Sequence, residues 1–360
     1  MQQRAFDEVL VAAENHNVDV RRFAAVDLGK LARGGDLRAI PVLLRMLADG
    51  GDYVDEAASD ALASIGEPAV VPLIELLWDR EANPRSRGWA ARTLGTIQAP
   101  DAFEPMAAVL ADTDEDPEVQ RMVAFYLGRL GDRRAVEPLT AAMTSPVEDL
   151  EVRKNAAYAL GELGDRRAFE ALLASLQDAR IGNWVGSALE ELRDERAVAA
   201  LFPTFGDEDE EWRYRVAPIV GKAGPSAIGP LLEALRSEDW RVRATAARAL
   251  SYSEADAAVG PLIEVLEKDE NEIVRAEAAT ALGFLNGDQI VSALLGGLRD
   301  AAVDVRRASA WGLHHLATLR KVGRDVIPTL EDVAASDRTE VNGRLVVREL
   351  LHRVIDQLNR

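Results

Sequence analysis

The sequence contains no cysteine, and this absence removes several classes of chemistry at once. Disulfide bonds, thiolate metal sites and a cysteine nucleophile all need a thiol, so none of them is available to this chain. Aromatic residues make up 5% of the chain, whereas hydrophobic residues of all kinds make up 48%. Small apolar residues must therefore supply much of the core, which favours helices packed close together.

Long apolar runs are also missing. No stretch approaches the roughly 18 consecutive apolar residues that a membrane span needs. The first twenty residues, MQQRAFDEVLVAAENHNVDV, have no basic region followed by an apolar segment, so no signal peptide is expected. Together with the absence of cysteine, this predicts a cytoplasmic protein.

Positive charge is scarce, and lysine is scarcer still. The chain has 42 basic and 61 acidic residues, for a formal net charge of −19, and only five basic residues are lysines. Such a field repels nucleic acids and anionic membranes, so neither is expected as a partner. Lysine-poor, acid-rich composition resembles that of proteins from salt-loving archaea, although a GC-rich genome alone also favours arginine. Salt adaptation is therefore an alternative explanation for any acidic surface.

One phrase recurs along almost the whole chain. Clear copies are VRRFAAVDLGKLA from Val20, VRKNAAYALGELG from Val152, VRATAARALSYSE from Val242 and VRAEAATALGFLN from Val274. Looser copies begin at Val54, Ser86, Val119, Ile181, Trp212 and Val305. Self-similarity at this spacing is the signature of a repeat architecture, here with about ten units.

Each unit predicts two helices joined by a tight turn. Val152, Ala156 and Leu160 follow one another at four-residue intervals, so they share one helical face. Glycine and aspartate follow, as at Gly131-Asp132, where glycine permits a left-handed turn and aspartate caps the next helix. Proline recurs near the start of the second helix, where its missing N–H costs little.

A helical hairpin of this size cannot bury its apolar face alone, so neighbouring hairpins must stack. We therefore predict an all-α fold, an α-solenoid or superhelix of about ten antiparallel helical hairpins. The repeat array is expected at residues 18–336, with an irregular segment at 180–218. Capping helices are expected at residues 1–17 and 337–360.

The pattern D..VR..AA.ALG.LGD.RAVEPL resembles the short HEAT repeat of the phycobilisome-lyase type, and the match spans roughly residues 18–335. Proteins with this repeat include bilin lyase subunits, deoxyhypusine hydroxylases, DNA-alkylation glycosylases and adaptors without chemistry. The resemblance therefore implies the fold and leaves the function open.

The motifs that would indicate catalysis are absent from the sequence. Deoxyhypusine hydroxylases bind iron through His-Glu pairs, but none of the four histidines here precedes glutamate. His314 and His315 are adjacent, and side chains about 100° apart on a helix suit joint metal ligation poorly. The negative charge argues against a DNA-binding groove. No metal, cofactor or catalytic residue is therefore predicted.

One arginine position repeats through the array. A ladder of arginines would suit phosphate binding. In this repeat family the same position usually bonds to carbonyls or aspartates of adjacent repeats, and we favour that structural role. The position is occupied by Arg21, Arg87, Arg153, Arg213, Arg243, Arg275 and Arg306.

Two sets of residues are candidates for binding a partner. Helical repeats curve, and we expect the second helices to line the concave side. Acidic residues at their outward positions would then attract a basic segment of another protein. These residues are Glu75, Glu104, Glu137, Glu170, Glu233 and Glu264.

The second set surrounds the irregular segment, where Gly182, Gly186, Pro203 and Pro218 interrupt expected helices. We predict a kink or a change of superhelical pitch there, with aromatic side chains gathered around it as a binding site or as a packing adjustment. These are Trp184, Phe202, Phe205, Trp212 and Tyr214.

Three further aromatics, Phe125, Tyr158 and Trp311, occupy a first-helix position that we expect on the convex surface. They either mark an interface or pack against the adjacent first helix.

The sequence thus favours a non-catalytic scaffold or adaptor that binds another protein through its concave face. The alternative is a lyase- or chaperone-like subunit acting on a tetrapyrrole or a client protein. The oligomeric state stays open, with a monomer favoured.

Overall fold

The computed structural model describes residues 2–51, 53–337 and 346–359, and in this part of the chain it contains 22 α-helices, eight short 3₁₀ turns and no strand. The all-α prediction is therefore confirmed. Residues 338–345, within the predicted C-terminal cap, lie outside the described residues. The chain divides into two compact units, Met1–Leu192 and Arg193–Arg360. The boundary falls inside the segment that the sequence marks as irregular.

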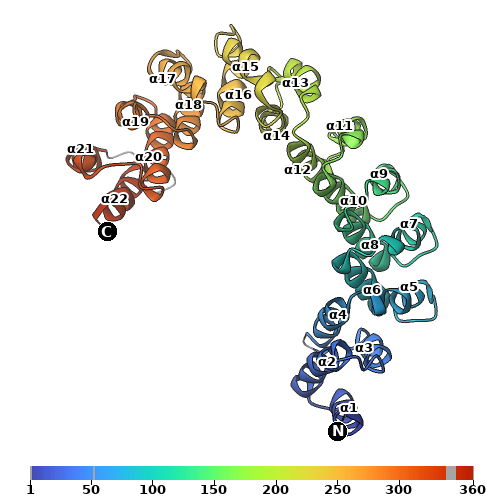
Figure 1. Ribbon diagram of the computed structural model, residues 1–360. Helices are drawn as coiled ribbons and strands as arrows, with labels where there is room; N and C mark the ends of the chain where they lie inside the picture. Colours follow the sequence, from blue (N-terminus) through green and yellow to red (C-terminus); the bar gives the residue numbers. More distant parts are fainter. Residues whose placement is uncertain (1, 52, 338–345, 360) are drawn as a thin grey trace. The chain divides into compact units, whose positions relative to one another are not determined.

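The first unit holds one terminal helix, α1 (Gln2–Ala13), and then alternating first and second helices (Figure 1). The first helices are α2 (Val18–Arg33), α4 (Val54–Ile65), α6 (Pro84–Ile97), α8 (Pro117–Arg129), α10 (Leu150–Leu163) and α12 (Gly182–Leu192). The second helices are α3 (Ala39–Met46), α5 (Val70–Trp78), α7 (Phe103–Ala111), α9 (Val136–Thr144) and α11 (Phe169–Ser175).

The second unit continues the alternation. Its second helices are α13 (Arg196–Leu201), α15 (Ile228–Ala234), α17 (Val259–Lys268), α19 (Ile290–Gly297) and α21 (Ile327–Ser336). Its first helices are α14 (Glu210–Gly221), α16 (Trp240–Leu250), α18 (Glu272–Phe284), α20 (Val303–Thr318) and α22 (Val346–Asn359). Ten successive pairs of helices along the described chain, from α2 and α3 to α20 and α21, correspond to the ten copies of the sequence phrase.

A 3₁₀ turn leads into most of the second helices. The turns are η1 (Glu67–Ala69), η2 (Pro100–Ala102), η3 (Arg133–Ala135), η4 (Arg166–Ala168), η6 (Pro225–Ala227), η7 (Asp256–Ala258) and η8 (Arg324–Val326), while η5 (Phe202–Thr204) follows α13. The predicted turn chemistry is confirmed at two of them. Gly131 and Gly164 have φ of 73° and 60°, and the carboxylates of Asp132 and Asp165 accept the cap hydrogen bonds of η3 and η4.

The irregular segment behaves as its residues dictate. Helix α13 is only six residues long, and Pro203 lies in the η5 turn that ends it, because proline has no N–H for the helix to use. Pro218 lies inside α14, as the sequence indicates. The second helix is therefore short at this point, while the predicted kink or change of superhelical pitch stays a prediction.

Small residues bring the first helices of successive repeats together. A Cβ built on Gly128 of α8 would lie 2.6 Å from the Cβ of Ala159 on α10, and one on Gly161 would lie 2.9 Å from the Cα of Ala188 on α12. In the second unit, a Cβ on Gly283 would lie 2.8 Å from the Cα of Gly312. Within each unit, these first helices therefore sit directly against their neighbours, where a larger side chain would hold the backbones apart.

This close packing corrects one prediction about curvature. Within each unit, successive first helices contact each other extensively and successive second helices contact each other little. A row with closer spacing occupies the inner side of a bend, and Figure 1 shows the second helices of each unit fanned out on the outer side. The prediction that second helices line the concave side is wrong. It was based on the order of the two helices in each repeat, whereas the bend depends on which row of helices carries the smallest side chains.

The repeated arginines form a buried seam between repeats, so their predicted structural role is confirmed. Arg243 is typical: its guanidinium donates to both carboxylate oxygens of Asp269 at 2.7 and 2.9 Å and to the carbonyl of Ser237 at 2.8 Å. Arg275 makes the same set of bonds with Asp300 and with the carbonyl of Asp269. In α8, glutamine replaces arginine, and Gln120 donates to two carbonyls instead.

The seam predicts loss of stability in acid. A hydrogen bond from Arg21 holds the pKa of Asp49 below its ordinary value of 3.8, and a hydrogen bond from Arg275 does the same for Asp300. Because the folded pKa is lowered, each ionised carboxylate stabilises the fold above pH 3.8. This stabilisation is lost as the pH falls from there through the folded pKa.

We therefore expect the urea midpoint to decrease on acidification from about pH 5 to about pH 2.5. Asp49→Asn and Asp300→Asn should lower the midpoint at neutral pH and flatten its pH dependence. Acidification below the isoelectric point, near pH 4.8, also leaves the basic residues in excess, and their mutual repulsion adds to the loss. Unchanged pH dependence in both variants would contradict the assignment of acid sensitivity to the seam.

Candidate functional site

The glutamates predicted to form an acidic groove lie on second helices, on the outer row of each unit. Glu104 accepts from Arg134 at 3.0 Å, and Glu137 accepts from Arg167 at 3.0 Å. Each arginine belongs to the next repeat, so the two ion pairs join neighbouring second-helix segments across the surface. Their charge is therefore largely balanced within the chain.

The other predicted glutamates are also exposed on second helices. Glu75 lies on α5, Glu170 on α11 and Glu233 on α15. Glu264 lies on α17 and pairs with Lys268 at 3.3 Å. The six glutamates, which we call the acidic stripe, are therefore exposed, but they lie on the outer side of the bend in each unit.

The aromatic side chains predicted around the irregular segment are divided between the two units. Trp184 belongs to α12 in the first unit and is 47% exposed. In the second unit, ring contacts among the described residues join Phe202 to Phe205 at 5.0 Å, and Phe205 is fully buried. Phe205 is therefore a core residue, and half-buried Trp212 and exposed Tyr214 lie on α14.

Among the described helices, exposed large apolar side chains occur on five first helices and on one second helix, α5, which carries Val71 and Trp78. In the first unit they include Phe23 and Val26 of α2, Tyr53 just before α4, Tyr158 of α10 and Trp184 of α12. Residues of this kind at exposed positions commonly mark surfaces that bind another molecule. The inner row is therefore the better candidate for a binding surface.

Two neighbouring parts of this inner surface are already filled by contacts within the chain. The rings of Phe125 and Tyr158 stack 5.3 Å apart and bridge α8 and α10. Arg92 stacks on Trp89 and pairs with Asp60 at 3.0 Å, which bridges α6 and α4. We predicted that Phe125 and Tyr158 either mark an interface or pack against the adjacent first helix. They do pack against each other from adjacent first helices, but on the inner side of the bend and not on the convex side.

A groove remains open between α2 and α4. Its volume is about 390 Å³, and it is lined on one side by residues of α2 and on the other by Tyr53 and residues of α4. Phe23 and Tyr53 stand at its edges, 62% and 66% exposed. The lining residues are Arg22, Phe23, Val26, Gly29, Arg33, Tyr53, Glu56, Ala57, Asp60, Ala61 and Ser64.

Tyr53 has a left-handed backbone, with φ of 62° and ψ of 16°. Side chains other than glycine rarely adopt this conformation, and they do so at a cost of about 1 kcal/mol or more. Its side chain makes no capping hydrogen bond, whereas Asn17, Asn83 and Asp116 cap their first helices. The local structure therefore holds an unfavourable backbone while it exposes an aromatic ring.

The inner row of the second unit carries a polar cluster. The Arg248 guanidinium lies 3.4 Å from the ring centre of Tyr214 and forms an ion pair with Glu277. Burial raises the pKa of Glu277, and Arg248 offsets part of that increase. Tyr214 therefore belongs to an ionic contact between α14, α16 and α18.

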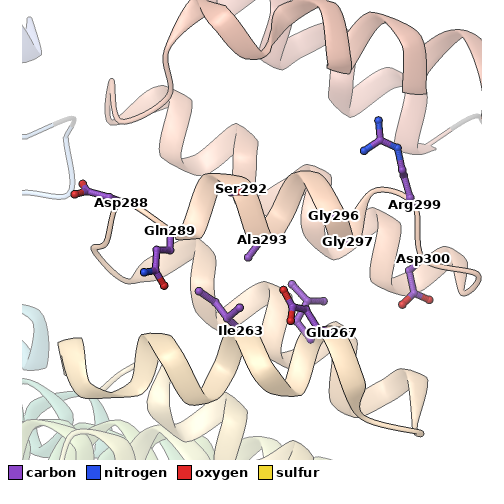
Figure 2. A pocket seen from close by; sticks show the side chains of 11 residues that line it. Ile263, Glu267, Asp288, Gln289, Ser292, Ala293, Gly296, Gly297, Arg299 and Asp300 are labelled. Carbon is purple, nitrogen blue, oxygen red and sulfur yellow. The ribbon is translucent and has the colours of Figure 1, made fainter.

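A second groove, of about 600 Å³, lies on the outer row of the second unit between α17 and α19 (Figure 2). Ala293, Gly296 and Gly297 leave the α19 side without bulk, while Ile263 and Glu267 project from α17. Asp300 at its end is engaged by Arg275 at 2.8 Å. The groove therefore offers few exposed apolar side chains.

No group of three or more histidine, aspartate or glutamate side chains in the described ranges is arranged to hold a metal ion. His314 and His315 are both half-buried, and His315 stacks on Trp311 at 5.6 Å. In the same ranges, no helix is both long and apolar enough to cross a membrane.

Sequence reasoning missed the importance of Phe23, Val26 and Tyr53. A signal was present in the repeat alignment, because position four of the phrase is variable and holds Phe23 and Trp184 in two copies. The role of Tyr53 was harder to predict from the sequence, since its left-handed backbone depends on the residue at which α4 begins.

Comparison with known families identifies the repeat. The HEAT repeat model matches residues 52–116, 108–183, 183–251 and 259–350, which together span most of the chain. The chain therefore belongs to the HEAT-repeat family. The model of the PBS lyase HEAT-like repeat also matches, at residues 242–268. No curated protein matches the sequence.

Solved structures share the fold at low identity. The karyopherin Kap121p bound to the SUMO protease Ulp1p is 14% identical with a TM-score of 0.51, over 99% of this chain and 45% of that one. The chain thus spans less than half the length of Kap121p.

Two enzyme structures superpose less closely. The complex of CpcE and CpcF of phycocyanin lyase from Nostoc sp. is 22% identical with a TM-score of 0.40, over 45% and 99% of the two chains. Human deoxyhypusine hydroxylase is 23% identical with a TM-score of 0.31, over 79% and 98%. At these identities the similarity concerns the fold.

Proposed function

We propose that the chain is a non-catalytic protein-binding scaffold that uses the inner, first-helix surface of its HEAT-repeat units. The observation that carries the proposal is the concentration of exposed large apolar side chains on that row, including Phe23, Tyr53 and Trp184. Interfaces are enriched in aromatic side chains, so their exposure on one row of helices favours that row as a binding surface. The fold itself is compatible with this role, since Kap121p shares it and binds the protease Ulp1p.

The finer proposal of a basic partner for the acidic stripe has weaker support. Arg134 and Arg167 already occupy Glu104 and Glu137, so a basic segment would have to displace them. Exposed ion pairs of this type contribute less than about 1 kcal/mol, so displacement is feasible. Glu170 and Glu75 would complete such a contact along the outer row of the first unit.

Site-specific photo-cross-linking tests the proposal. We expect a benzoylphenylalanine at Tyr158 or Trp184 to cross-link one discrete protein in lysate of the source organism, because both side chains are exposed on the inner row. The matched control is the same probe at Val71, a 62% exposed residue of the second helix α5. Adducts from Val71 with none from the inner positions would overturn the inner-surface assignment, and no adduct from any position would overturn the scaffold role.

The same assay separates the acidic stripe from the inner row. Reversing the charge at Glu104, Glu137 and Glu170 should leave the inner cross-links intact if the inner row binds alone. Loss of the adduct in the triple variant, with helicity unchanged, would show that a basic segment contributes.

A lyase- or chaperone-like subunit is the second candidate, because residues 242–268 match the PBS lyase HEAT-like repeat. Transfer or retention of an added tetrapyrrole, seen as visible absorbance that co-purifies with the chain, would favour this candidate over a scaffold.

A further inference from the structure

We propose that the groove between α2 and α4 is a docking site for one short amphipathic helix of a partner protein, with cations on one flank and anions on the other. This rests on the proposed scaffold function and names the chemistry of its ligand. The observations that support it are the shape of the groove, its exposed apolar edges and the unequal charges of its two sides.

The shape suits a helix. The lining residues of α2 lie at positions 22, 26, 29 and 33, so they form a single stripe down that helix. At 1.5 Å per residue the stripe is about 16 Å long, or about three helical turns. A ligand helix with apolar residues at i, i+4, i+7 and i+11 spans a similar length and presents one face to such a groove.

The floor and edges are apolar, and the contact of Arg22 with the Phe23 ring, at 5.4 Å, stays within α2. Gly29, Ala57 and Ala61 are small and leave the space between the helices open, while Phe23, Val26 and Tyr53 border it. A Cβ on Gly29 would lie 2.9 Å from the Cβ of Ala61, so the glycine is needed for the close α2–α4 contact. In the described residues, no aromatic stack or arginine bridges this gap as Phe125–Tyr158 and Arg92 bridge their own gaps.

The two sides differ in charge. The α2 side carries Arg22 and Arg33, of which Arg22 pairs with Asp19 at 3.0 Å. Arg33 is exposed and forms no ion pair within the described ranges. The α4 side carries Glu56 and Asp60, which share one guanidinium, that of Arg92, at 3.6 and 3.0 Å.

One positive charge and one negative charge therefore remain available on opposite sides of an apolar groove. Complementary charges on a ligand raise its association rate and fix its register. A helix that carries lysine on one flank and glutamate on the other satisfies both sides in one of its two directions, because reversing the helix exchanges its flanks. A helix with one sign on both flanks meets repulsion from one side.

Three synthetic peptides test this directly. All have the same leucine face; one carries lysine and glutamate on opposite flanks, one carries lysine on both and one carries glutamate on both. In fluorescence anisotropy with the full chain, we expect the mixed peptide to bind at least fivefold more tightly than either of the others. Equal binding of the three peptides, or binding of none, would overturn the proposal.

Variants locate the site. Phe23→Ser and Tyr53→Ser should each weaken the mixed peptide about tenfold, while Val71→Ser, at an exposed residue of the second helix α5, should leave it unchanged. The double variant E56K/D60K should come to prefer the peptide with glutamate on both flanks. Circular dichroism confirms that each variant is folded, and an unchanged affinity in Phe23→Ser and Tyr53→Ser would place the peptide elsewhere.

A second copy of this chain is the competing occupant. Sedimentation equilibrium of the protein alone, showing a dimer that Tyr53→Ser dissociates, would replace the helical ligand with self-association. The cross-linking experiment stays independent of these results. Adducts at Tyr158 or Trp184 with no peptide binding would refute this groove as the docking site and leave the scaffold function standing.

Discussion

Replacing Arg87 by methionine should destabilise the protein more than any other single change in the arginine seam, by about 3–5 kcal/mol. Arg87 donates to both oxygens of Glu115, at 2.7 and 2.5 Å, and to the carbonyl of Leu77 at 2.9 Å. Both side chains are only 4% exposed, so removing the arginine leaves a carboxylate buried without its partner. Thermal unfolding followed by circular dichroism measures the effect.

The matched control is Arg134→Met, which breaks ion pairs with Glu104 and Asp132 on the surface. The arginine is 55% exposed there, and we expect a loss of less than about 1 kcal/mol. The double variant Arg87→Met, Glu115→Leu should recover much of the stability, since it removes the unpaired charge as well. A single Arg87→Met variant as stable as Arg134→Met would contradict the view that the seam joins the repeats.

Replacing Gly128 by valine should destabilise the first unit by at least about 1–3 kcal/mol, because the new side chain has no space. Even a Cβ at this position would lie 2.6 Å from the Cβ of Ala159 and 2.9 Å from its Cα. Backbone atoms cannot move aside as a flexible side chain does, so α8 and α10 must separate. Thermal unfolding and urea titration both report the loss.

Gly296→Ala is the control of opposite sign. A Cβ at Gly296 would meet nothing within 4 Å, and the residue lies in helix α19 without a positive φ. Alanine should therefore stabilise the helix by about 0.5–1 kcal/mol relative to glycine. If the two substitutions changed the free energy of unfolding equally, helix propensity would explain the effect at Gly128, and the contact between first helices would not.

The helices themselves were predictable from particular residues. The spacing of Val152, Ala156 and Leu160 predicts one buried face, and all three side chains are fully buried. Gly131 and Asp132 predict a turn and a cap, and both adopt those roles. These features are local, since a few neighbouring residues set the backbone conformation and the burial pattern.

The surface that binds was less predictable, for a physical reason. An outward helix position can be recognised from periodicity, so the exposure of Glu104 and Glu137 follows from the sequence. Periodicity does not report that Arg134 and Arg167, thirty residues further on, reach those carboxylates. Nor does it report which row of helices is packed more tightly.

By itself, the sequence determined the helical hairpins, their number and the arginine seam, because each depends on a pattern that repeats in every unit. Only the tertiary structure decided which helix row lies inside the bend of each unit and that an open apolar groove remains between α2 and α4. The curvature follows from a small-residue contact that recurs, as Gly29 against Ala61 and Gly128 against Ala159. The open groove depends on differences between repeats, such as the left-handed Tyr53. The physical reason is that curvature and open space follow from distances between backbones, which the side chains of two neighbouring helices set together.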